Sequence, residues 1–124
     1  MLSFDTNLVV YACNVDAPEC APARAWIESL ATRTDVVVAE LMLVEVYLKI
    51  RNPRILRTPF PAADAAAYCQ AFRSNPRWTL VDHAPVMPEV WAGSGRKDFA
   101  VRRIINARLA LTLRYYGVTH FATA

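Results

Sequence analysis

The chain has 124 residues, 55% of them hydrophobic and 20% charged, which suits one globular domain with its own core. No apolar stretch reaches the ~20 residues of a membrane span, and the amino terminus lacks the features of a signal peptide, so we expect a cytoplasmic protein with no membrane association. Three cysteines without a C-x-x-C pair, and two widely separated histidines, argue against a disulfide framework and a zinc site. The net charge of +3 permits contact with nucleic acid without establishing it.

Asp5 stands at the first boundary between two predicted elements. Residues 2–4 are predicted to form a short buried strand, and the apolar run over residues 8–13 predicts a helix. A carboxylate at this point faces the crevice beyond the strand's carboxyl end, where open α/β sheets bind ligands. The alternative is that Asp5 only caps the helix that follows it. Residues 21–32 predict a second helix.

Glu45 lies within the next strand-and-helix unit. The three valines at residues 36–38 predict a buried parallel strand, and residues 39–50 predict a helix that ends before Pro53. The neighbours of Glu45 in this helix are mostly apolar. A carboxylate in such a stretch is costly unless it has a partner, so Glu45 is a second candidate for a functional acid.

The second half of the chain continues the alternation of helices and strands. Helices are predicted at residues 62–74 and 85–91 and strands at residues 78–81 and 118–122. Residues 96–116 have a helical pattern that can break or kink, and Gly117 suits the end of that helix. We therefore predict an α/β fold, with a short parallel sheet of about four strands and helices on both faces.

The arginines gather in two groups. Each group is either a solvated helix face or a surface that contacts phosphates or an acidic partner. The first group contains Arg51, Arg54 and Arg57, and the second contains Arg96, Arg102, Arg103, Arg108 and Arg114.

The acidic residues suggest the chemistry of the protein. The chain has no G-x-G-x-x-G motif, P-loop or G-x-S-x-G elbow. Carboxylates such as Asp5 and Glu45 can converge where parallel strands end, and they then need a cation to offset their repulsion. Mg²⁺ or Mn²⁺ suits oxygen ligands, and phosphodiester hydrolysis is the chemistry that such a site supports.

Several segments resemble the PIN-domain family. Residues 4–12, F-D-T-N-L-V-V-Y-A, are similar to its D-T-N start, and residues 39–46, A-E-L-M-L-V-E-V, are similar to its second acidic helix. Asn52-Pro53, residues 107–110 and residues 117–123 resemble the VapC-type toxin branch. The resemblance covers the whole chain in the right order. It implies one PIN-like domain over residues 1–124.

The resemblance also implies an activity and partners. A VapC-type chain is a Mg²⁺- or Mn²⁺-dependent endoribonuclease that cleaves RNA. A cognate antitoxin protein holds it inactive, and it commonly forms a homodimer. Asp5 and Glu45 occupy two of the family's acidic positions. We expect an antitoxin or a second copy of the chain to cover an apolar surface, since the composition is 55% hydrophobic.

The chain departs from the family's pattern at two places. The third acid is replaced by Asn106, which keeps an oxygen ligand but loses the charge, so the expected activity is weak. Asp98 is the only acid nearby, about 12 Å upstream along a continuous helix, and it could replace the third acid only if that helix breaks. The chain also ends at Ala124, before the family's usual last acid and last strand, so truncation of a longer protein is one explanation.

Three hypotheses remain at this point. The first is an active ribonuclease with Asp5, Glu45 and Asn106 in its catalytic site and Asp98 as a further candidate metal ligand. The second is a PIN-fold protein that binds an antitoxin or RNA without cleaving it. The third is an unrelated α/β domain in which the acids are caps and buried structural groups.

Overall fold

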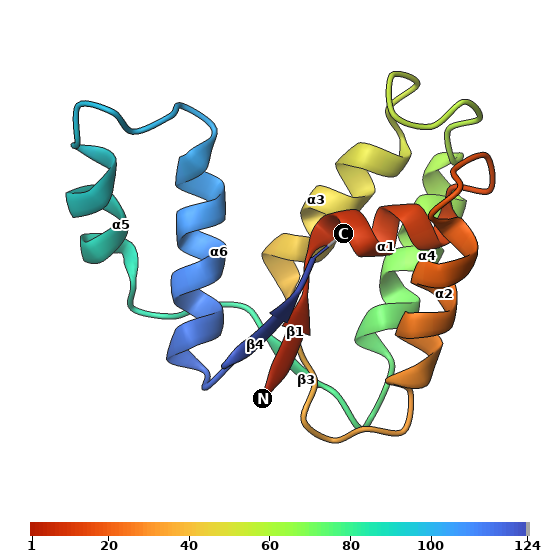
Figure 1. The fold of residues 1–124 in the computed structure, drawn as a ribbon, viewed down its shortest axis with the longest axis horizontal. Helices are drawn as coiled ribbons and strands as arrows, with labels where there is room; N and C mark the ends of the chain where they lie inside the picture. The colour runs from red at the N-terminus through yellow and green to blue at the C-terminus, as the bar shows by residue number, and fades with distance from the viewer. Residues whose placement is uncertain (124) are drawn as a thin grey trace.

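A computed structural model describes residues 1–123 (Figure 1). The elements follow the predicted alternation, and the α/β fold is confirmed. Their bounds in chain order are β1 Leu2–Phe4, α1 Thr6–Cys13, α2 Cys20–Ser29, β2 Val37–Ala39, α3 Glu40–Ile50, α4 Ala62–Arg73, β3 Thr79–Val81, α5 Met87–Ser94, α6 Arg103–Tyr115 and β4 His120–Ala122.

The strands form two parallel pairs. β1 pairs with β4, with Leu2 opposite His120, and β2 pairs with β3. A single parallel bridge between Leu2 and Val36 brings the pairs together, and the amide of Leu2 donates to the carbonyl of Asp35 at 2.7 Å. The strands therefore run in the order β3-β2-β1-β4. The carboxyl ends of β1 and β4 meet at one edge, where the amide of Asp5 donates to the carbonyl of Ala122.

Helices lie on both sides of these strands. Figure 1 shows α1, α2 and α4 on one side and α6 on the other, with α5 beyond α6. The main core lies among β1, β2 and α1 to α4, and Leu109 and Leu113 of α6 reach into it. A second, small cluster lies between α5 and α6 and contains Ala84, Val86 and Val90.

Two boundaries are defined by the structure. The helical pattern over residues 96–116 does break, since residues 95–102 lie in turns and irregular backbone and α6 begins at Arg103. Phe99 is half-buried in these turns while Val101 is 90% exposed, so the segment lacks the single buried face that would continue a helix. Ala39 belongs to β2 and not to the helix, because its backbone is extended. Gly117 takes a φ of 86° after α6, as the predicted helix end requires.

Candidate active site

Asp5 stands between β1 and α1 at the edge of the main core. It occupies the N-cap position of α1, with φ −72° and ψ 149°, but its side chain makes no capping hydrogen bond. The explanation of Asp5 as a side-chain cap therefore has no support in the structure. The backbone amide donates to the carbonyl of Ala122, and the half-buried side chain lines the cleft beyond β1.

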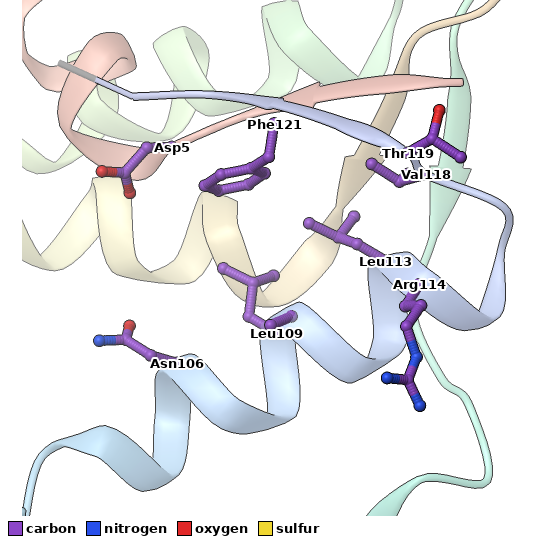
Figure 2. Close-up of a pocket in the computed structure, with 9 residues that line it drawn as sticks. Asp5, Asn106, Leu109, Leu113, Arg114, Val118, Thr119 and Phe121 are labelled. Carbon is purple, nitrogen blue, oxygen red and sulfur yellow. The ribbon is translucent and has the colours of Figure 1, made fainter.

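A cleft of about 490 Å³ runs between β4 and α6, and Asp5 and Asn106 both line it. Figure 2 shows the two side chains at the same end of the cleft, Asp5 from the end of β1 and Asn106 from the first turn of α6. The walls between them are mainly apolar, and Arg114 lies toward the other end. The lining also includes Leu109, Ala110, Leu113, Val118, Thr119 and Phe121.

Glu45 lies on α3 and reaches the residue next to Asp5. The hydroxyl of Thr6 donates a long hydrogen bond of 3.4 Å to Oε2 of Glu45. The other carboxylate oxygen, Oε1, is buried and has no hydrogen-bond partner within residues 1–123. Thr6 is itself 1% exposed, so it fixes Glu45 from inside the fold. An unpartnered carboxylate oxygen in such a place is costly, and a bound cation is one way to offset the cost.

Two polar contacts near this site were missed in the sequence analysis. The bond from Thr6 to Glu45 has no local signal in the sequence, since the two residues lie 39 positions apart. Lys49 lies one turn after Glu45 on α3, and its ammonium donates to Oδ1 of Asn7 at 2.9 Å. The i,i+4 spacing of Glu45 and Lys49 places both on one face of the helix. This contact brings a positive charge to the segment that carries Asp5.

Asp98 is exposed in the turns between α5 and α6 and does not line the cleft. In the part of the chain that the structure describes, no group of three or more His, Cys, Asp and Glu residues could hold a metal ion. The structure thus brings Asp5 and Asn106 to one cleft and places Glu45 against the neighbour of Asp5. Asn106 brings a neutral amide to the cleft, so Asp5 is the carboxylate among the lining residues that the structure describes.

The chain is similar in sequence to proteins that are named as ribonucleases. No family profile matches the chain. Ribonuclease VapC24 of Mycobacterium tuberculosis is 50% identical over 123 residues, which are 99% of this chain and 85% of that protein. The chain belongs to the VapC family. It is therefore a toxin endoribonuclease by family, which confirms the resemblance found in the sequence.

The chain is also similar to two further VapC proteins of Mycobacterium tuberculosis, one in sequence and one in fold. Ribonuclease VapC25 is 28% identical over 89 residues, or 71% of this chain and 59% of that protein. The crystal structure of VapC20, a toxin that cleaves the sarcin-ricin loop, superposes with a TM-score of 0.72 at 16% identity, over 98% of this chain and 87% of that one. This second likeness concerns the fold alone.

VapC nucleases generally depend on a divalent metal, and VapC toxins imply an RNA substrate and a cognate antitoxin. No helix within residues 1–123 is both long and apolar enough to cross a bilayer.

Proposed function

We propose that this VapC chain uses Asp5 and Glu45 to hold Mg²⁺ or Mn²⁺, with Asn106 as a weak third ligand across the cleft. The observation that carries the proposal is the buried Oε1 of Glu45, which has no hydrogen-bond partner among the described residues. Thr6 holds the other oxygen of that carboxylate, and Asp5, the residue before Thr6, leaves its own carboxylate without a capping bond. Hard oxygen ligands of this kind suit both cations.

The bound cation would activate water and stabilise the leaving oxygen of a phosphodiester. The chain's own residues would prepare the site for it. Thr6 keeps the Glu45 carboxylate in one orientation, and the Lys49–Asn7 contact ties α3 to the start of α1. Leu109 and Leu113 are 6% and 3% exposed, and their packing sets the position of α6 and therefore of Asn106.

The activity of the chain as written should be low. Asparagine at position 106 provides one neutral oxygen in place of a carboxylate, so less negative charge faces the cation. Losing one well-placed electrostatic group costs roughly 10²- to 10³-fold in rate in other active sites. The loss of this negative charge is therefore expected to slow the hydrolysis step that the cation would assist.

A rescue experiment tests this proposal. The Asn106→Asp variant should bind Mg²⁺ more tightly and cleave a mixed RNA substrate roughly 10²-fold or more faster than the chain as written. Asn52→Asp adds the same charge outside the cleft and keeps the oxygen that accepts from the amide of Arg54, so it serves as the matched control. Adding Asp5→Asn to the Asn106→Asp variant should abolish the gain. An unchanged metal affinity and rate in Asn106→Asp would place residue 106 outside the metal site and favour Asp98.

The second candidate function is binding without cleavage. The replacement of the third acid by Asn106 favours it, because the fold and the cleft remain while the charge needed for hydrolysis falls. A chain that binds RNA or an antitoxin with normal affinity, yet shows no cleavage even as Asn106→Asp, would support this function over the first.

The expected protein partners are a cognate antitoxin and a second copy of the chain. α3 supports this part of the proposal, because Val44 and Leu48, one turn apart, are 52% and 63% exposed. Such a pair gains by being covered. Light scattering should show a dimer that dissociates in a Leu48→Asp variant. A monomer at high concentration, with no change of state when the antitoxin is added, would count against both partners.

A further inference from the structure

A second hollow lies between α5 and α6 and adjoins the active-site cleft. Its volume is about 560 Å³, and it is lined by Arg96, Phe99 and Arg103 together with residues of both helices. Asn106 and Ala110 line this hollow and the cleft alike. These two residues lie one turn apart on α6, so a flexible ligand in the cleft could continue across α6 into the hollow.

The rim of this hollow is positively charged. Between residues 96 and 108 the chain has five basic residues and one acid, Asp98. Within residues 1–123, Arg96 and Arg103 form no ion pair. Glu89 also lines the hollow, but Arg114 contacts its carboxylate at 3.4 Å. Most of the positive charge beside the hollow is therefore left for an outside anion.

Phe99 stands between the two arginines in sequence and is half-buried in the wall of the hollow. An aromatic ring beside unpaired guanidinium groups is the arrangement that proteins use for single-stranded nucleic acid. The cations follow the phosphates, and the ring stacks on a base. The hollow thus contains both the cations and the ring, and it shares Asn106 with the cleft that Asp5 lines.

We propose that the α5–α6 hollow binds the single-stranded RNA segment that flanks the bond positioned at Asp5. Arg96 and Arg103 contact its phosphates, and Phe99 stacks on one base. The inference rests on the proposed function, because it takes RNA as the substrate that enters the cleft. It goes beyond that function by naming where the rest of the RNA is held.

The test measures RNA binding without cleavage. All chains carry Asp5→Asn, and a fluorescent uridine 12-mer is titrated while its anisotropy is followed. The double variant Arg96→Gln and Arg103→Gln should bind about tenfold or more weakly, and the salt dependence of its affinity should fall by roughly 0.7 per lost phosphate contact. The matched control, Arg54→Gln with Arg57→Gln, removes the same charge from the other arginine group and should change binding much less.

Two further variants separate the parts of the proposal. Phe99→Leu keeps apolar volume but removes the ring, and it should weaken binding by roughly 5- to 100-fold with the salt dependence unchanged. Arg96→Lys with Arg103→Lys keeps the charge and should bind nearly as the parent does, which also guards against a folding defect in the glutamine variant. Circular dichroism and thermal unfolding check that each variant folds.

Several outcomes would overturn the inference. Equal weakening by the two arginine pairs would mean that only overall charge matters. Unchanged RNA affinity in the Arg96 and Arg103 variant, with loss of binding to an acidic protein partner, would make the hollow a protein interface. The proposed nuclease can fail separately. If Asn106→Asp gains no cleavage while these binding differences persist, the RNA subsite stands and the metal site does not.

Discussion

The body of the protein, from β1 to α4 with β3 and β4, and the arm formed by α5 and α6 are built differently. In the body, Phe4 is fully buried, and its ring lies 6.0 Å from that of Trp26 and 5.9 Å from that of Trp78. Within residues 1–123, the apolar cluster at the arm has three buried residues, Ala84 and Val86 just before α5 and Val90 within it. Trp91 of α5 is 60% exposed, and Val101, between the two helices, is 90% exposed. Figure 1 shows the arm to one side of the strands, with α6 nearer to them than α5.

The difference matters for function because the candidate site uses both regions. Asp5 and Glu45 belong to the well-packed body, whereas Asn106 belongs to the arm. The two acids are therefore held by a large core, and the position of Asn106, the proposed third ligand, depends on how Leu109 and Leu113 pack α6 against that core. When a site is divided in this way, the protein can keep its fold while Asn106, the site residue on the arm, limits the activity.

Core truncation should show the largest difference between the two regions. Phe4→Ala removes a ring from the centre of the aromatic cluster and should lower the free energy of unfolding by about 3–5 kcal/mol. Trp91→Ala removes a larger ring from the exposed face of the arm and should cost less than about 1 kcal/mol. Urea unfolding of both variants measures the contrast. Similar losses would mean that the arm is packed as firmly as the body.

Alkaline pH should lower the stability of the protein by a smaller amount, and the groups responsible lie in the body. Burial raises the pKa of the Cys13 thiol from 9.0 to about 11, and burial also raises the pKa of the Tyr68 phenol. Since these values are higher in the folded chain than in the unfolded one, the stability they contribute is complete below the unfolded values and is lost as the pH rises. We expect a loss of roughly 1–2 kcal/mol between about pH 8 and about pH 10.

The variant Cys13→Ala isolates this effect. It should start less stable than the parent at neutral pH, because a buried side chain is shortened, but its stability should fall less steeply as the pH rises. Urea unfolding at each pH measures both quantities. An equally steep fall in the variant would show that Cys13 does not contribute to the pH dependence.

Sequence reasoning worked best in the body. The strand before Asp5 and the apolar neighbours of Glu45 were visible as local patterns, and both predicted elements formed. The bond from Thr6 to Glu45 joins residues 39 positions apart, so no local pattern could reveal it. In the arm, the helical pattern of residues 96–116 allowed a break but did not place it around Phe99, because helical periodicity does not report where a segment must fold back.

The site residues were predicted unevenly for the same reason. Asp5 could be placed from the order of strand and helix, and Asn106 from its resemblance to an acidic position. Their meeting in one cleft depends on α6 packing across β4, which is a tertiary arrangement. Asp98 was considered because it is near in sequence, but it lies in the turns outside the cleft. Its role as a metal ligand stays a prediction.

The most direct test of the account is Mn²⁺ binding to the chain without RNA, measured by calorimetry or by the loss of the free-ion electron paramagnetic resonance signal. The chain as written should bind one ion weakly, and Asp5→Asn and Glu45→Gln should each reduce the affinity by more than about tenfold. Asp64→Asn removes an exposed acid from α4 and should leave the affinity unchanged. If Mn²⁺ binds Glu45→Gln as tightly as the parent, Asp5 and Glu45 do not share a cation, and the proposed site is wrong.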